Sequence, residues 1–258
     1  MNRFLHDLWR NRELLQLLVA RNIKIRYKSS ILGFVWTLLN PILFIGIYAM
    51  FLGLLKVAIA LPLLVSGVIV WSFLDMCLGD SLYAVIGNTN LIKKTSFSRP
   101  TLPVAMVLSN LVNFVLSLII LGCYLIFARV SPQHLWLLPV FVLSQTALCL
   151  GLALIISAMN VYFRDTEHIL AVVKLAWFFM TPIIYPISFV FDQVSPTLQK
   201  AAFLNPMTGL VTAYRWVLMS EDIIAPQLVT MSHAICWGVL AVGILIFQRA
   251  ERGFADEL

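Results

Sequence analysis

Residues 103–128 read PVAMVLSNLVNFVLSLIILGCYLIFA, and none of them carries a charge. About 20 apolar residues in an α-helix cross a bilayer core roughly 30 Å thick, so this stretch predicts a membrane-spanning helix. The rest of the chain has the same character, because 61% of the 258 residues are hydrophobic and only 12% are charged. Soluble domains carry about 25% charged residues. The composition therefore excludes a soluble domain and predicts an all-α membrane protein.

Five other stretches meet the same criterion of length and composition. The six predicted transmembrane helices, which form a domain over residues 32–248, are 32–55, 62–87, 103–128, 136–159, 167–185 and 228–248. The segment 186–227 between the last two is also apolar. Four prolines prevent it from forming one straight helix, namely Pro186, Pro196, Pro206 and Pro226. We expect two short re-entrant helices that dip into the outer leaflet and return.

Lysine and arginine are unevenly divided between the two sides of the membrane. Thirteen of the 18 lie in segments expected on one side, four on the other, and Lys174 lies within the fifth span. Because cytosolic loops are enriched in these residues, both termini are expected in the cytosol. Residues 1–31 are then a cytosolic amphipathic interface helix and residues 249–258 a cytosolic tail. This rule accounts for the net charge of +6, so no nucleic-acid partner is expected.

Charged residues within the spans need an explanation of their own. Asp75 and Asp80 lie in the second span, where a central aspartate costs about 2.5 to 3.5 kcal/mol for insertion. Their carboxylates are therefore expected to face protein or water rather than lipid. Lys174, near the start of the fifth span, is expected to snorkel toward the cytosolic interface.

Several classes of function are disfavoured by what the sequence lacks. No GxxxxGK[ST] phosphate-binding loop occurs, so the chain is not expected to be an enzyme that hydrolyses ATP. The four cysteines lie in apolar stretches without a CxxC pair, which argues against a disulfide or a metal site. Matched broken spans of an ion-coupled carrier are missing. Ser66 with His233 is a poor candidate for an intramembrane serine protease, because the motif around the serine is incomplete.

The stretch that follows the N-terminal basic residues resembles a known family. Residues 26–36, RYKSSILGFVW, are similar to the membrane permease subunit of type-2 ABC exporters of lipid-linked polysaccharides. In that family a basic interfacial helix, a Leu-Gly turn and an aromatic residue open the first span. Further similar stretches follow in the same order at residues 90–99, 160–168, 181–186, 205–215 and 251–256. Ser98-Arg99-Pro100, at the end of the stretch that begins at residue 90, departs from the order Phe-Pro-Arg that is usual there.

The resemblance implies a function and a set of partners. The chain would be the channel-forming subunit of an exporter of undecaprenyl-diphosphate-linked polysaccharide, with O-antigen of lipopolysaccharide as the first candidate, in the cell inner membrane. Two cytosolic ABC ATPase subunits would hold ATP and magnesium, while this chain would form a homodimer and bind no cofactor. The alternatives are a teichoic acid or capsule exporter, a type-2 permease for a small lipid or drug, and a membrane scaffold for a polysaccharide synthase.

Two groups of residues are candidates for contact with such a substrate. Its diphosphate requires cations at the cytosolic entrance, and the family places the Leu-Gly turn and a gate helix there. The predicted entrance comprises Arg26, Lys28, Leu32, Gly33, Lys93, Lys94 and Arg99. The predicted channel lining is a stripe along the first span that comprises Trp36, Asn40, Phe44, Tyr48 and Phe51. Simple anchoring by the cations, and packing or lipid contact by the stripe, remain the alternatives.

Two further groups are predicted away from the entrance. ATPase coupling is assigned to Arg164, Asp165 and His168, with an intraloop ion pair between the first two as the alternative. An outer gate is assigned to Asn205, Pro206, Tyr214 and Arg215. Arg215 is expected to pair with Glu221 or Asp222, or else to meet the departing glycan, because an unpaired arginine is costly in a membrane.

Overall fold

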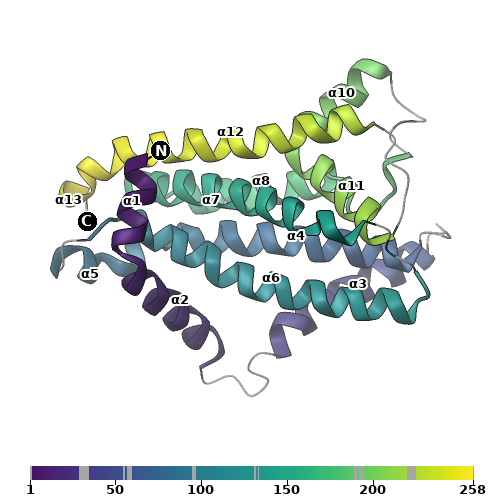
Figure 1. Ribbon diagram of the computed structural model, residues 1–258, viewed down its shortest axis with the longest axis horizontal. Helices are drawn as coiled ribbons and strands as arrows, with labels where there is room; N and C mark the ends of the chain where they lie inside the picture. Colours follow the sequence, from purple (N-terminus) through teal and green to yellow (C-terminus); the bar gives the residue numbers. More distant parts are fainter. Residues whose placement is uncertain are drawn as a thin grey trace.

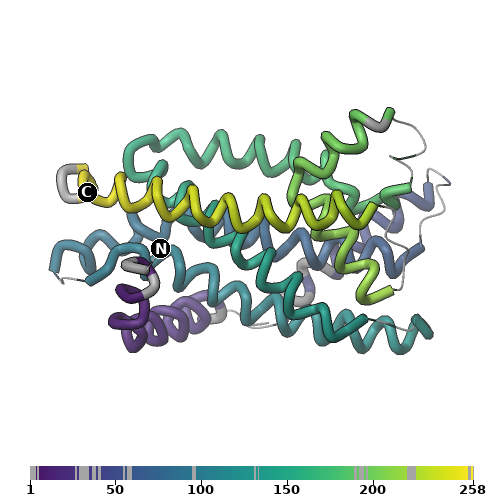
Figure 2. Tube along the Cα trace, turned by 45° about the horizontal axis from the view of Figure 1, so that its top comes forward, coloured from purple at the N-terminus to yellow at the C-terminus, as the bar shows by residue number. Residues whose placement is uncertain are grey.

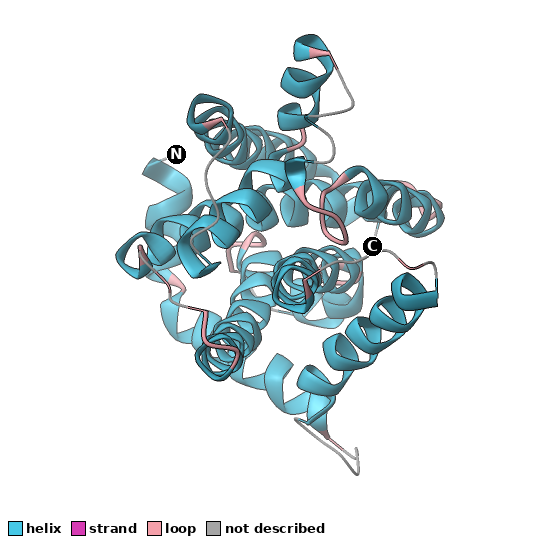
Figure 3. Ribbon diagram, turned by 90° about the vertical axis from the view of Figure 1, so that its right-hand side faces the viewer, coloured by secondary structure: helices cyan, strands magenta, loops and turns pink. Residues whose placement is uncertain are grey.

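The structure is a computed structural model that describes residues 2–28, 35–54, 56, 60–94, 97–130, 132, 134–188, 191, 195–219 and 225–257. Within these ranges the regular elements are helices, and no strand occurs. The long helices run side by side as one elongated bundle (Figure 1), which is seen end-on in Figure 3. The all-α prediction is confirmed for the described part of the chain.

Four helices follow the predicted spans closely. They are α4 (Leu61–Leu82), α6 (Thr101–Phe127), α7 (Leu138–Tyr162) and α12 (Pro226–Ala250). A 3-10 turn, η3 (Leu135–Leu137), precedes α7, and η4 (Glu251–Gly253) follows α12. With these turns included, all four are long and apolar enough to cross a membrane. Uninterrupted apolar runs therefore predicted these elements to within a few residues.

The fifth predicted span is shorter in the structure than predicted. Helix α3 covers Trp36–Leu54, and α8 covers Thr166–Met180, which is 15 residues or about 22 Å of helix. The predicted end of the fifth span at residue 185 is wrong. Thr181 takes an extended conformation with ψ 137°, because the proline that follows it disfavours helical geometry at the preceding residue.

The remaining helices are short and cap the two ends of the bundle. The N-terminal region forms two helices, α1 (Asn2–Arg10) and α2 (Arg12–Tyr27). One end of the bundle also carries η2 (Ile86–Asn88), α5 (Thr89–Lys94) and α13 (Phe254–Glu257). Helix α1 crosses the direction of the long helices at this end, where α13 also lies (Figure 1). Among the described residues of the segment 186–227 lie α10 (Pro196–Leu204) and α11 (Pro206–Met219), at the opposite end, and residues 187, 188 and 191 are helical as well. The re-entrant path of this segment stays a prediction.

The core of the bundle is held by close helix contacts. Helices α7 and α12 lie side by side along most of their length (Figure 2). A Cβ atom on Gly151 of α7 would lie 2.5 Å from the backbone oxygen of Val239 on α12, and Gly243 of α12 faces Gly151 in return. Glycine at both positions lets the backbones approach, as at many helix interfaces in membranes. Helix α4 packs against α3, α6, α7, α8 and α11, so it is the central helix of the bundle.

Candidate functional site

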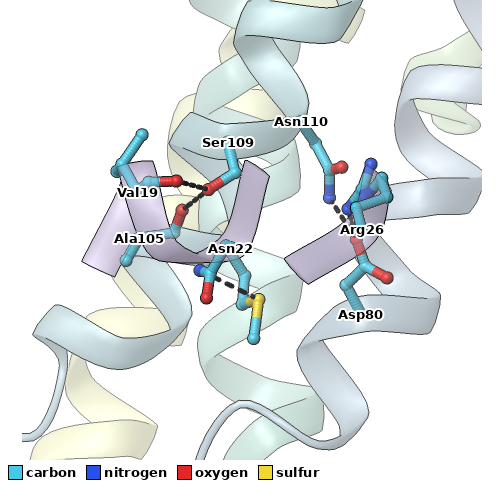
Figure 4. Close-up of polar contacts among 8 residues, drawn as sticks. Val19, Asn22, Arg26, Asp80, Ala105, Ser109 and Asn110 are labelled. Carbon is cyan, nitrogen blue, oxygen red and sulfur yellow. Dashed lines mark hydrogen bonds and ion pairs between the residues drawn. The ribbon is translucent and has the colours of Figure 1, made fainter. Parts of the chain in front are cut away.

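The second N-terminal helix is fixed to the bundle by a partly buried polar contact. Arg26 of α2 forms an ion pair with Asp80 of α4, and the Asn110 amide of α6 donates to the same Asp80 oxygen at 2.8 Å (Figure 4). The Asp80 carboxylate thus has a cation and an amide as partners. The expectation that Asp80 faces protein rather than lipid is confirmed.

Further polar contacts hold α2 along its length. The Arg21 guanidinium donates to the side-chain oxygen of Asn88 at 2.7 Å. The Asn22 amide donates to the sulfur of Met106 at 3.3 Å, and the Ser109 hydroxyl lies 3.5 Å from the backbone oxygen of Val19 (Figure 4). These contacts join residues far apart in the sequence, and none was predicted from it. Helix α2 is therefore docked on α4 and α6 rather than held by its apolar face alone.

The predicted entrance residues fall into two structural groups. Arg26 and Arg99 are engaged with protein: Arg99 donates to the backbone oxygen of Glu251, and its guanidinium lies 5.9 Å from the ring centroid of Phe254. The side chains of Lys28, Lys93 and Lys94 are exposed. Leu32 and Gly33 lie outside the described residues. The role of the set as a substrate entrance stays a prediction.

Arg99 joins the segment before α6 to the C-terminal residues Glu251 and Phe254. Phe254 is fully buried and also packs against Phe247, with ring centroids 5.5 Å apart. The Tyr162 hydroxyl donates to the backbone oxygen of Ala250 at 2.6 Å. The C-terminal residues from Ala250 to Phe254 are thus attached both to the end of α7 and to the segment before α6. They connect these elements at this end of the bundle.

The predicted channel stripe on α3 is mostly exposed. Trp36, Phe44 and Phe51 are 41%, 55% and 54% exposed, respectively. Tyr48 is half-buried, because its ring stacks on Phe178 of α8 with centroids 5.5 Å apart. The side chain of Asn40 lies outside the described residues. Exposure fits either a channel lining or a lipid-facing surface, so the lining role stays a prediction.

A second ion pair joins α4 to α8. The Lys174 ammonium lies 2.8 Å from the Asp75 carboxylate, so this lysine reaches a partner at its own depth instead of snorkelling to the interface. Nearer the end of α4, the Tyr83 hydroxyl donates to the Glu167 carboxylate, and this hydrogen bond raises the pKa of Tyr83. Both aspartates of the second predicted span therefore have protein partners.

The predicted coupling residues lie at the start of α8. Arg164, Asp165 and His168 are all exposed, and Asp165 directly precedes the first residue of the helix. Arg164 and Asp165, both among the described residues, do not form an ion pair with each other. This surface is available to a partner, but a coupling role stays a prediction.

At the other end of the bundle, Arg215 is almost completely buried. It is 2% exposed and donates to the backbone oxygens of Leu63, Ile183 and Tyr185 at 3.1, 2.9 and 3.2 Å. A guanidinium suits this position because its five N–H groups form a fixed planar fork. The alternative partners Glu221 and Asp222 lie outside the described residues.

The other predicted outer-gate residues are also built into the structure. The Asn205 side-chain oxygen accepts from the Trp177 indole at 2.7 Å and from the Met207 backbone N–H at 3.0 Å. Pro206 begins α11, and Tyr214 is fully buried against Phe114. A gate at this end stays a prediction, and Tyr214 and Arg215 would act in it through packing rather than through the surface.

The chain was compared with known proteins. The family model described as "ABC-2 type transporter" matches residues 13–219. The chain is 33% identical over its whole length, and over the whole length of the relative, to an "O-antigen export system permease protein RfbA" from Myxococcus xanthus. It is 26% identical to a protein of the same description from Klebsiella pneumoniae, with 95% of each chain covered.

Proposed function

Because the chain belongs to the ABC-2 type transporter family, we propose that it is the permease subunit of an exporter of lipid-linked O-antigen polysaccharide. The observation that carries this proposal is the full-length similarity to O-antigen export permeases. The helical bundle supports it, because four of its helices are long and apolar enough to cross a membrane. A transport component of this family needs no catalytic site of its own.

The proposed topology has six spans in the cell inner membrane, with α3 and α8 as the first and fifth. Both are apolar but short, so residues flanking them would complete the crossing. Helices α1 and α13 lie at one end of the bundle, as an even number of spans requires (Figure 1). The exposed lysines Lys93 and Lys94 of α5, which lies at the same end, favour the cytosol for that end.

The proposed assembly contains two copies of this chain and two cytosolic ABC ATPase subunits that bind ATP and magnesium. Side chains such as Phe73, Leu74 and Tyr214 fill the centre of the bundle. A polymer path therefore belongs at the surface of the bundle, between two copies, which supports a homodimer. Undecaprenyl diphosphate is the expected carrier lipid.

Deleting the gene should remove O-antigen from the cell surface. Lipid-linked polysaccharide should accumulate on the cytosolic side of the inner membrane. The reason is that the hydroxyls and phosphates of the substrate cannot cross hydrocarbon unaided. The measurement is surface labelling of the polysaccharide, with a plasmid copy of the gene as the control. Unchanged O-antigen with loss of capsule or teichoic acid would assign the exporter to that polymer. Drug-stimulated ATPase activity in the reconstituted complex, without glycan stimulation, would favour the drug exporter.

Replacing Arg164 and Asp165 together with alanine should uncouple ATP hydrolysis from export. Both side chains are exposed at the start of α8, where an ATPase subunit would transmit its closure to that helix. We expect at least a tenfold loss of export per ATP hydrolysed in the reconstituted complex, with normal amounts of assembled complex. The control is Arg249→Ala, an exposed arginine at the end of α12. Coupling equal to that of the control would contradict the role.

A further inference from the structure

Helices α4 and α8 meet along a line of three contacts. Tyr83 donates to Glu167, Asp75 pairs with Lys174, and Trp71 meets Phe178 with ring centroids 5.5 Å apart. Residue numbers fall along α4 as they rise along α8, so the helices are antiparallel there. Tyr83 directly follows the last residue of α4. The other two contacts are four residues apart on each helix, which keeps them on one face. We call this set the α4–α8 seam: Trp71, Asp75, Tyr83, Glu167, Lys174 and Phe178.

The seam is open at one end and closed at the other. Tyr83 is 48% exposed, the Asp75 side chain is 44% exposed, and the Lys174 side chain is 23% exposed. At the far end the two aromatic residues are nearly buried, with Trp71 at 7% and Phe178 at 9%. The charged pair therefore lies on a surface that leads inward from the end of the bundle that carries α1.

This charged pair lies well inside the apolar length of the helices. Asp75 precedes the end of α4 at Leu82 by seven residues, or about 10 Å of helix. Lys174 follows the start of α8 at Thr166 by eight residues, or about 12 Å. Charged side chains at such a depth face protein or a water-filled space, because lipid solvates them poorly.

The rest of the α8 surface is different. Val172 and Leu175 are 68% and 62% exposed and suit contact with hydrocarbon. Val172 is two residues before Lys174, and a rotation of about 200° places it on the opposite side of the helix. The same short helix thus presents a charged, partly exposed side and an apolar, exposed side.

We propose that the α4–α8 seam lines the translocation path and that the Asp75–Lys174 pair binds hydroxyl groups of the passing glycan. This assignment rests on the proposed function. The charges of this ion pair cancel. Its carboxylate accepts hydrogen bonds and its ammonium donates them, and a sugar hydroxyl can both donate and accept. The pair is a poor site for the carrier diphosphate, because Asp75 would repel it.

The seam also joins the predicted channel stripe. Phe178 at its closed end stacks on Tyr48 of α3, and Tyr48 stacks on Phe44 with centroids 6.4 Å apart. Aromatic faces contact sugar rings without a fixed set of hydrogen bonds. The buried ring of Phe178 thus links the charged pair to the aromatic residues of α3, so the two surfaces are neighbours in the bundle.

Thiol labelling tests whether the seam faces water. Ala171 lies on the seam side of α8, between Glu167 and Lys174, and Val172 is the matched control on the opposite side at the same depth. Each is changed to cysteine in the full chain, with exposed Cys123 replaced by alanine, and treated with a charged thiol reagent in inverted membrane vesicles. We expect Ala171→Cys to react at least five times faster than Val172→Cys. Glu167→Cys is a second reporter on the seam side. A ratio below five for both reporters would overturn the proposal.

Protection from labelling tests the ligand. Polysaccharide freed from its lipid should slow labelling of Ala171→Cys at least threefold, and Lys174→Met should abolish this protection. Inorganic pyrophosphate should not protect. Protection by pyrophosphate alone, or by neither probe, would overturn the glycan assignment. Labelling does not depend on export. If the seam is exposed to water but deletion of the gene leaves surface O-antigen unchanged, only the proposed function is refuted.

Discussion

Replacing Arg215 with methionine is expected to lower the melting temperature of the purified protein by roughly 6 to 12 °C. The three backbone oxygens that accept from Arg215 would lose a donor in a site that is almost fully buried. At about 1 kcal/mol for each hydrogen bond lost, the loss is roughly 3 kcal/mol. For a chain of this size each kcal/mol corresponds to about 2 to 4 °C.

The Arg215 contacts join separate parts of the bundle. Leu63 lies in the first turn of α4, Ile183 and Tyr185 follow α8, and Arg215 lies on α11, so one side chain connects three parts of the bundle at this end. Arg215→Lys should give an intermediate melting temperature, because an ammonium lacks the planar fork of the guanidinium. Lys200→Met, at an exposed cation on α10, is the control. A melting temperature for Arg215→Met equal to that of the control would show that the contacts contribute little.

The sequence predicted the parts of this fold that depend on local composition. Helices α4, α6, α7 and α12 were found because their apolar runs are long and unbroken, and the prolines of 186–227 indicated that no single straight helix forms there. The end of α8 was predicted wrongly because the apolar run continues beyond Thr181, whereas the helical backbone conformation ends at Met180. The contact of Gly151 with α12 was missed too, because a glycine within an apolar run carries no signal of which helix it faces.

The predictions about charged residues were right in kind but incomplete in detail. Solvation alone predicted that the carboxylates of Asp75 and Asp80 face protein or water rather than lipid. Their partners could not be identified, since Arg26 is 54 residues away from Asp80 and no local pattern links them. The same holds for Arg99, whose acceptor on Glu251 is 152 residues distant. Arginines that the sequence suggests as substrate ligands can therefore already bind acceptors within the protein itself.

Arg26→Asp is expected to reduce surface O-antigen at least tenfold, and the structure gives a specific reason. The substitution would place two carboxylates where α2 docks on α4, and their repulsion would release α2 from the bundle. The original interpretation of Arg26 as a ligand of the diphosphate predicts the same loss. Export by the single variant therefore does not distinguish docking from ligand binding, and the reciprocal exchange is needed.

The double variant Arg26→Asp with Asp80→Arg distinguishes the two roles. It restores opposite charges across the α2–α4 contact, and the side-chain oxygen of Asn110, which is buried without a donor in the described structure, can accept from the new guanidinium. If Arg26 acts through docking, we expect export to recover to at least half of the wild-type level. The control is Arg12→Asp, an exposed arginine on the same helix, which should export normally. A double variant that is present in the membrane in normal amounts but does not export would show that Arg26 itself contacts the substrate.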